Sequence, residues 1–418
     1  MAKKQKKAIS EQVPTKSQLS KWQRQMRIRR IVIIAAVVFL VGISIWVGYG
    51  YYRDRIKPWR EVVIKVNDIP FTMEYFVKYF TRVLDVNTAG MNSTLVYYYA
   101  NYVVDYIDDE IIDGELLRQG AKSLNITVTA GEIDAKLIEY KLPNDRVSRD
   151  IVSAALSQQK LNEYFSSGLN ATMEQAHVQV MLVESQEVAN EVIAEVEAGG
   201  NFTALVEEFS CNSTIEGDLG WRPTELMPNT LIANAAFNLT PGEISQPIYD
   251  ETAIKDVGYW LIEVTDKQGE RIKARVMLLG SEVEADWVKA QLAAGGNFSA
   301  LAGNYSQHKS KTKGGELDWL KRGDMGSNAF DAIAFNITVN EVSEPVKDES
   351  VQTTGGYWLV KVVDRGDHEL EEKVKEGLID KHFSDWFEEW TKTKESTIEN
   401  HLDEAKKTWA VNKVLEGR

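Results

Sequence analysis

Cysteine and histidine are scarce in this chain of 418 residues, and their scarcity excludes several kinds of site. Cys211 is the only cysteine, so no disulfide framework can form within the chain and no cysteine-rich metal site is expected. The 5 histidines are scattered, and no His-Glu-x-x-His motif for zinc is present. The sequence also lacks a phosphate-binding loop and the glycine fingerprint of dinucleotide-binding domains. We therefore expect no metal and no cofactor.

Positive charge is in short supply outside the start of the chain. The formal net charge is −14, yet residues 1–30 carry ten Lys or Arg against one acid, Glu11, and sum to +9. The remaining residues therefore sum to −23. A basic arm on an acidic body argues against nucleic acid as a partner of the body.

Charged residues are absent from residues 31–52, which read IVIIAAVVFLVGISIWVGYGYY. This length matches the roughly 20 apolar residues that span a bilayer, and Trp46 and Tyr51 are placed as in an aromatic interface belt. The preceding basic residues predict a single-pass anchor in a bacterial cell membrane, with a cytoplasmic N-terminus and an extracytoplasmic body. A cleaved signal peptide would have a shorter apolar region and an Ala-x-Ala-like site, which we do not find. A buried core helix is disfavoured because no charge interrupts the run.

The region of residues 53–175 has a mostly helical pattern. Residues 62–72 alternate like a strand with a turn at Asn67 and Asp68. Apolar residues then recur at helical spacing over residues 94–124, and Thr129 with Glu132 forms a capping-box pattern at the start of another helix. A further helix is expected over about residues 144–166.

The tail, residues 369–418, is charged and helical in pattern. Four aromatic residues follow one another at helical spacing and share one face: Phe383, Trp386, Phe387 and Trp390. A stripe of this kind is more often core than ligand site. We expect it to pack on the helical region and to close one domain from both ends of the chain.

An internal repeat occupies the two stretches 176–269 and 270–368. The matched segments are VQVMLVES with ARVMLLGS, AGGNFTALVEEFS with AGGNFSALAGNYS, GDLGW with GELDW, AAFNLTPGEISQPI with IAFNITVNEVSEPV, and GYWLIEV (258–264) with GYWLVKV (356–362). Each copy has the size of a small domain. The order of strand, helix, glycine-rich turns, short helix and strand predicts an α+β domain.

The repeat resembles the parvulin domain of peptidyl-prolyl isomerases, on the strength of these segments taken together. The preceding region, from VVIKVNDIPFT to AGEIDAKL, resembles the N-terminal chaperone region of SurA- and PrsA-type foldases. The resemblance extends from about Glu61 to the tail. It implies an α+β protein with one transmembrane helix, a helical chaperone domain, and two parvulin-like domains with small antiparallel sheets.

Parvulins carry two histidines at the floor of the proline site, on the first and last strands of the domain. The resemblance assigns the first position to Val180 and Val276 and the second to Trp260 and Trp358, so none of the four is histidine. His177 lies three residues early and would point to the opposite face of a continuous strand. Isomerase (rotamase) activity is what the family implies, and these four substitutions argue against it here.

A third polar position of the family falls on Cys211 in the first copy and on His308 in the second. Either residue could be a polar substitute in the site. The alternatives are an inert, partly buried thiol for Cys211 and a solvated loop histidine for His308, and these alternatives are favoured.

The proline pocket implied by the resemblance is formed by Met325 and Phe330 in the second copy and by Met227 and Ile232 in the first. These four residues could equally be ordinary core. Tryptophan offers a large flat surface to prolyl and aromatic side chains, so Trp260 and Trp358 are also candidates for peptide binding.

Three functions are compatible with the sequence. The first is a membrane-anchored extracytoplasmic foldase with peptidyl-prolyl cis-trans isomerase activity, which assists exported proteins. The second is a catalytically inactive chaperone, or holdase, that binds unfolded or proline-containing exported polypeptides. The third is an interaction protein of the cell envelope, for which only the duplicated architecture speaks.

Overall fold

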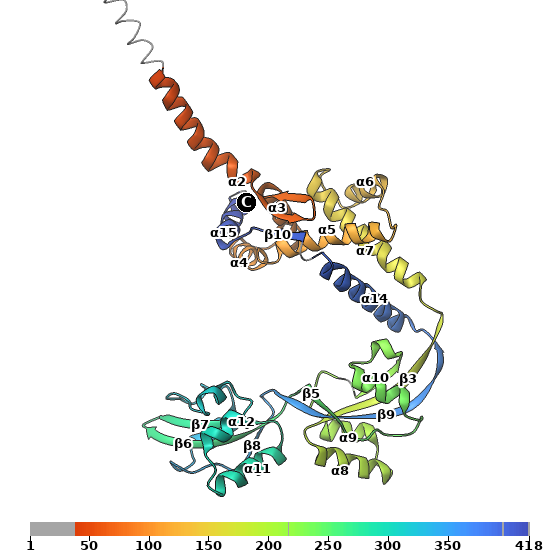
Figure 1. Ribbon diagram of the computed structural model, residues 1–418, viewed down its shortest axis with the longest axis vertical. Coiled ribbons are helices and arrows are strands. Elements are labelled where there is room, and N and C mark those ends of the chain that lie inside the picture. Colours follow the sequence, from red (N-terminus) through yellow and green to blue (C-terminus); the bar gives the residue numbers. More distant parts are fainter. Residues whose placement is uncertain (1–37, 216, 395–396, 417–418) are drawn as a thin grey trace, which may run out of the picture. The chain divides into compact units, whose positions relative to one another are not determined.

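The computed structural model describes residues 38–215, 217–394 and 397–416, and it consists of two compact units (Figure 1). The first unit contains the described residues up to Glu163 together with those from Asp385 onward, and the second is Tyr164–Ser384. The basic arm 1–30 and the first part of the proposed anchor, residues 31–37, lie outside the described residues. Residues 38–51 are helical. Within the described ranges, no helix is both long enough and apolar enough to cross a membrane.

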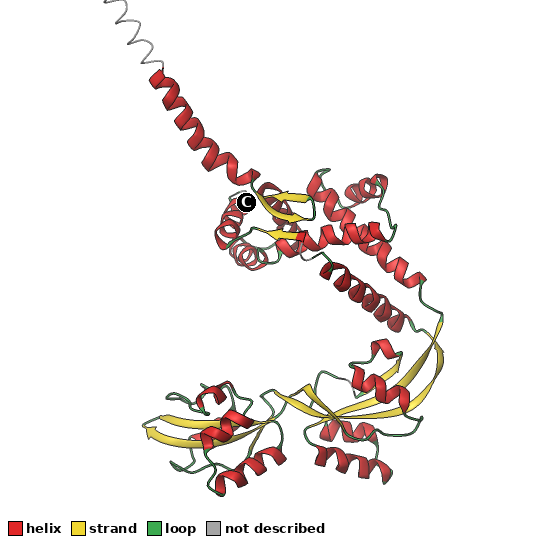
Figure 2. Ribbon diagram, in the orientation of Figure 1, coloured by secondary structure: helices red, strands yellow, loops and turns green. Residues whose placement is uncertain are grey.

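The first unit is mostly helical (Figure 2). Its helical segments are η1 (Tyr52–Ile56), α2 (Lys57–Arg60), α3 (Met73–Asn87), α4 (Ser93–Val103), α5 (Ile107–Ser123), α6 (Ala130–Glu139), most of α7 (Arg146–Ser167), the end of α14 (Glu372–Lys392) and α15 (Glu404–Leu415). The helical pattern over 94–124 therefore forms two helices, because the chain turns at residues 104–106.

A small antiparallel sheet of order β10-β1-β2 completes this unit. Strands β1 (Val62–Val66) and β2 (Ile69–Thr72) form the hairpin expected from the alternation, and Asn67 in the turn has φ of +53°. The third strand, β10 (Ile398–Asn400), comes from the tail and was not foreseen. Helix α6 begins with the capping box of Thr129 and Glu132.

Residues from both ends of the chain share the core of the first unit. Phe76 and Phe80 of α3 are fully buried in it, and Val411 of α15 belongs to the same cluster. The indole of Trp390 packs against this cluster and donates a hydrogen bond from Nε1 to the carbonyl oxygen of Leu116 at 3.1 Å. Of the four tail aromatics, Phe387 and Trp390 thus pack against the core of the helical unit.

The second unit contains two lobes, each built on one antiparallel sheet. The first lobe has the sheet β4-β3-β9-β5 and the helices α8, α9 and α10. Its elements are β3 (Thr172–Val183), α8 (Gln186–Glu197), α9 (Phe202–Phe209), β4 (Asp218–Arg222), η2 (Thr224–Leu226), α10 (Thr230–Asn238), β5 (Ile248–Lys255) and β9 (Thr353–Glu369).

The second lobe has the sheet β7-β6-β8 and the helices α11, α12 and α13. Its elements are β6 (Gly258–Gln268), β7 (Arg271–Leu279), α11 (Glu282–Ala293), α12 (Phe298–Tyr305), η3 (Lys309–Lys313), α13 (Asn328–Ala334) and β8 (Val346–Asp348). In both lobes helices cover both faces of the sheet. Side chains of β3 alternate between a core with α10 and a core with α8 and α9.

Neither sheet is formed by one sequence repeat alone, because the last strand of each repeat pairs with the first strand of the other. β3 of the first copy pairs with β9 of the second copy, in a register that aligns Val180 with Val360. β6 of the first copy pairs instead with β7 and β8 of the second copy. The second lobe is therefore an insertion of residues 258–348 between β5 and β9 (Figure 1).

The predicted boundary between 176–269 and 270–368 separates the two repeats, whereas the sheets combine strands from both repeats. Gly269, at that boundary, adopts φ of +62° in the tight turn that joins β6 to β7. The chain passes from one lobe to the other after β5 and returns after β8. At this crossing Lys255 of β5 pairs with Thr353 of β9. Each lobe receives one strand from the other copy because the crossing stretches are extended rather than folded back as hairpins.

Candidate peptide-binding sites

In the second lobe the parvulin-like positions come together around Trp260. Its ring packs edge-on against Phe330, with 5.4 Å between centroids, in a core that also includes Val276 and Met325. The indole Nε1 donates a hydrogen bond to Oδ2 of Asp348 at 2.8 Å. Trp260 is only 2% exposed and Phe330 is fully buried. The indole thus occupies the interior of the site.

The first lobe repeats this arrangement around Trp358. That side chain, 3% exposed, shares a core with Val180, Met227 and Ile232, which are also buried. Its Nε1 donates to Oδ2 of Asp250 at 2.9 Å. Both lobes thus bury a tryptophan and bind its N–H to a carboxylate.

The strand exchange changes which residues form each site. Within each sequence repeat, Val180 belongs with Trp260 and Val276 with Trp358. In the structure, Val180 lies with Trp358 and Val276 with Trp260. Val180 pairs with Val360 of β9, and Trp358 lies two residues before Val360 on the same strand. Trp358 and Val180 therefore project from the same face of the sheet. Trp260 has the same relation to Val276 through Ile262. Each site is therefore built from both copies.

His308 joins the site of the second lobe. Its ring lies 5.5 Å from that of Trp260, and its Nδ1 accepts a hydrogen bond from the backbone N–H of Ser310 at 3.2 Å. Burial, with a smaller contribution from Lys309, lowers the pKa of the imidazole. His308 is therefore neutral at pH 7, and it is half-buried rather than solvated.

Cys211 lies between the lobes, where it packs against the cores of both. Its Sγ donates to the carbonyl oxygen of Leu182 at 3.1 Å. Burial raises the pKa of the thiol to about 12. Because the thiolate is the reactive form, the raised pKa disfavours reaction of this cysteine at neutral pH.

The aspartates that accept the indole N–H groups were missed in the sequence. They occupy equivalent places in the repeat, in PIYDET and PVKDES, so an aspartate recurring three residues after a proline was the available signal. Asp348 also accepts hydrogen bonds from the hydroxyls of Ser327 and Ser350. Asp250 similarly accepts from the hydroxyl of Thr252 at 2.7 Å.

The aspartates are ionised. Burial alone would raise the pKa of Asp348, but the hydrogen bonds from Ser327, Ser350 and Trp260 outweigh it and lower the pKa below its usual value. Asp250 shows the same balance, with Trp358 and Thr252 as donors. The indoles are therefore tied to carboxylates by charge-assisted hydrogen bonds.

Two protein-family models match this chain. The PPIC-type PPIASE domain matches residues 175–266 and 280–364, and the SurA-like N-terminal domain matches residues 19–179. Chaperone SurA from Dechloromonas aromatica is 27% identical over 302 residues, which are 65% of this chain and 64% of that protein. Chaperone SurA from Chromohalobacter salexigens is 27% identical over 268 residues, 55% of this chain and 59% of that protein. The chain therefore spans about three fifths of the length of these curated relatives.

A crystal structure of PrsA from Bacillus subtilis aligns with 86% of this chain and 93% of its own, at 17% identity. The TM-score of this alignment is 0.21. The family matches define a parvulin-domain protein with a SurA-like N-terminal domain. The chain therefore resembles the SurA-type parvulin foldases.

Proposed function

We propose that this chain is an extracytoplasmic chaperone that binds unfolded exported polypeptides and accelerates prolyl isomerisation little or not at all. The observation that carries this proposal is the pair of buried tryptophans, Trp260 and Trp358, at the family's histidine positions in both lobes. The family matches support the foldase role.

The chemistry of isomerisation explains why these residues matter. Rotation about a peptide bond has a barrier of about 18–20 kcal/mol. No bond is broken, so the catalyst must hold the proline in an apolar pocket and stabilise the twisted amide over both planar forms. Here the indole of Trp260 and the ring of Phe330 fill the interior that a prolyl ring would need. The indole N–H, already bound to Asp348, is not free to contact a substrate amide.

Weak isomerase activity in the second lobe is the second candidate. It is favoured by His308, which lies beside Trp260, and by Met325, which stays partly exposed at the edge of the same core. A prolyl peptide would then contact Met325 and the imidazole edge rather than enter the core. The first lobe has a buried methionine, Met227, at the equivalent position.

One experiment separates these functions. The full chain, purified in mild detergent, is assayed for suppression of aggregation of chemically denatured citrate synthase and for cis/trans exchange of an Ala-Pro peptide by NMR. We expect suppression near equimolar chaperone and exchange within about twofold of the uncatalysed rate. Acceleration by a hundredfold or more would overturn the proposal. Loss of a smaller acceleration in Met325→Ala, but not in Met227→Ala, would assign the second candidate to the second lobe.

We further propose that the chain is tethered to a bacterial membrane through residues 31–52, with its body outside the cytoplasm. The charge-free run and the basic residues before it support this topology. The test is carbonate extraction of membranes from cells that make the full chain or a variant lacking residues 31–52. We expect the full chain to stay in the membrane pellet. Its release into the supernatant would refute the tether.

A further inference from the structure

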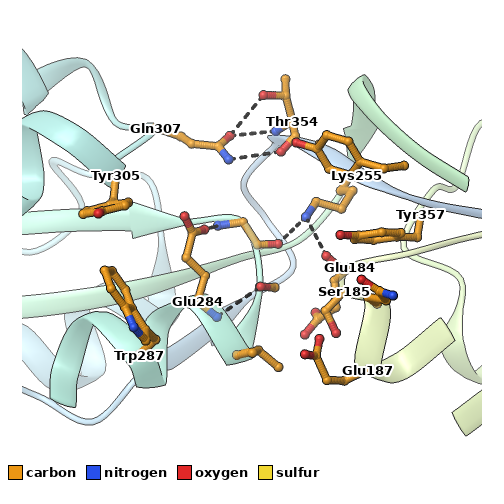
Figure 3. Close-up of a pocket in the computed structure, with 16 residues that line it drawn as sticks. Glu184, Ser185, Glu187, Lys255, Glu284, Trp287, Tyr305, Gln307, Thr354 and Tyr357 are labelled. Atoms are coloured by element: carbon orange, nitrogen blue, oxygen red, sulfur yellow. Dashed lines mark hydrogen bonds between the residues drawn. The ribbon is translucent and has the colours of Figure 1, made fainter. Parts of the chain in front are cut away.

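A cavity of about 420 Å³ lies between the two lobes of the second unit, and neither buried tryptophan lines it. Figure 3 shows its walls. The first lobe contributes the start of α8, the ends of β5 and the beginning of β9, and the second lobe contributes the start of α11 and the end of α12. We call this cavity the interlobe cleft.

Hydrogen bonds across the cleft hold its two sides together. The buried ammonium of Lys255 donates to the carbonyl oxygen of Gly280. The side-chain amide of Gln307 pairs with the backbone of Thr354, donating to its oxygen at 3.0 Å and accepting from its nitrogen at 2.7 Å. Glu184 accepts from the backbone nitrogen of Glu282 at 3.1 Å. The cleft is therefore a built feature of the fold.

Aromatic side chains stand exposed on both sides of the cleft. On the second lobe Trp287 and Tyr305 pack edge to face, with 5.0 Å between centroids, and are 44% and 37% exposed. On the first lobe Tyr249 and Tyr357 lie 5.2 Å apart, and Tyr249 is 57% exposed. Exposed aromatic pairs that face a cavity from two sides favour a flat apolar side chain between them.

The charge of the cleft selects among the ligands that aromatic walls would accept. Three glutamates line it, Glu184, Glu187 and Glu284, against a single cation, Lys255. Lys255 is 1% exposed and its ammonium is directed at carbonyl oxygens, so it offers little to an incoming anion. Glu187 is exposed. The rim thus favours a positively charged neighbour of the bound aromatic group.

We propose that the interlobe cleft binds an extended segment of unfolded polypeptide that carries an aromatic side chain next to a lysine or arginine. This inference rests on the proposed chaperone function and assigns it a site distinct from the proline-site positions. The aromatic side chain lies between Trp287 and Tyr249, and the cation faces Glu187. An acidic segment is rejected by the same glutamates.

The test uses the full chain in mild detergent and a fluorescein-labelled peptide of three Phe-Arg-Ser-Gly repeats, with binding followed by anisotropy. We expect Trp287→Ala and Tyr249→Ala each to weaken peptide binding by about tenfold, because exposed aromatic anchors at the centre of a site carry much of the binding energy. Glu187→Gln weakens it by about threefold, and added salt reduces that difference. Trp287 and Tyr249 are both exposed, so neither substitution removes core packing from its lobe.

Matched controls and the competing outcomes separate the cleft from the chaperone function. Trp319→Ala, another exposed tryptophan of the second lobe, and Glu195→Gln, a later exposed position on α8, leave binding unchanged. A peptide with Glu in place of Arg binds at least tenfold more weakly. If the wild type binds the peptide and suppresses aggregation while the three cleft variants bind equally well, the cleft is overturned and the function stands. If the wild type does neither, both fail.

Discussion

In both lobes a buried tryptophan donates a hydrogen bond from its indole to an aspartate, and this contact has two consequences. Trp260 with Asp348 and Trp358 with Asp250 place an indole N–H 2.8 and 2.9 Å from a carboxylate oxygen. The bond satisfies a buried donor, and the ring fills the core. A histidine at these positions would be smaller and would leave space beside the sheet. The tryptophans therefore fill space in the cores of the two lobes.

Replacing the indole by a smaller ring that lacks the donor tests this stabilising role. Trp260→Phe keeps an aromatic ring but leaves Oδ2 of Asp348 without one of its donors. We expect the second lobe to lose roughly 1–3 kcal/mol, as for hydrogen bonds to charged groups. Hydrogen-exchange mass spectrometry on peptides from β6 and β8 measures this local free energy. Trp319→Phe, at an exposed position, is the control. Equal protection in Trp260→Phe and wild type would contradict the expectation.

The aspartates also predict how stability depends on pH. The pKa of Asp348 is lowered in the folded chain, so its contribution is fully present above the unfolded pKa of about 3.9. That contribution is lost as the pH falls below about 4 and through the lower folded pKa. Urea midpoints measured by near-UV circular dichroism between pH 2 and 5 should fall less steeply in Asp348→Asn than in the wild type. The control Asp367→Asn, at an exposed position of β9, should retain the wild-type slope.

At the scale of elements, the close contact between α5 and α14 decides where the tail can dock. A Cβ atom at Gly120 would lie 2.7 Å from Cη2 of Trp386, so the absence of a side chain admits the indole. The next aromatic residue, Trp390, donates to the backbone of the same helix at Leu116. The tail therefore docks on α5 through both shape and hydrogen bonding.

Two glycines of α5 should respond in opposite directions to substitution by alanine. Gly120→Ala forces the ring of Trp386 to move and should destabilise the helical unit by about 1–3 kcal/mol. Gly114→Ala brings a Cβ atom to 3.6 Å from that of Ala154, an ordinary contact, and should stabilise by about 0.5–1 kcal/mol. Hydrogen exchange of peptides from α5 reports both. If both substitutions stabilise the helix, the ring of Trp386 does not exclude a side chain at residue 120, which contradicts the expectation.

At the scale of the whole molecule, the exchange of strands makes the two lobes depend on each other. The sheet of the first lobe needs β9, which the chain reaches only after the second lobe is complete. Loss of structure in the second lobe therefore removes the constraint that positions β9 beside β3. Exchange of equivalent elements is a known route between repeats because the contacts on either side are nearly the same.

Disulfide trapping distinguishes the two connectivities. In a Cys211→Ala background, Gln179→Cys with Lys361→Cys should form a disulfide, because these residues are direct partners in β3 and β9. Gln179→Cys with Glu263→Cys places the second cysteine at the repeat-equivalent position of β6, and it should stay reduced. Mass spectrometry of the non-reduced protein identifies the bond. Oxidation of the second pair instead would show that the copies fold without exchange.

Several features of the fold follow from local patterns that the sequence contains. The hairpin at Asn67, the capping box at Thr129 and the fold class depend on neighbouring residues, and each can be predicted from them. Other features depend on partners far along the chain, such as β10, or the break between α4 and α5, where the helical pattern alone continues.

The sequence by itself determined that the chain has two parvulin-like copies without the family's histidines, because residue identity at aligned positions needs no coordinates. Only the tertiary structure decided that Trp358 belongs with Val180 and Trp260 with Val276. The reason is physical: GYWLIEV and GYWLVKV are nearly identical strands, so either could complete either sheet. The extended crossing at Lys255 and Thr353 selects between them, and the same crossing forms the cleft between the lobes.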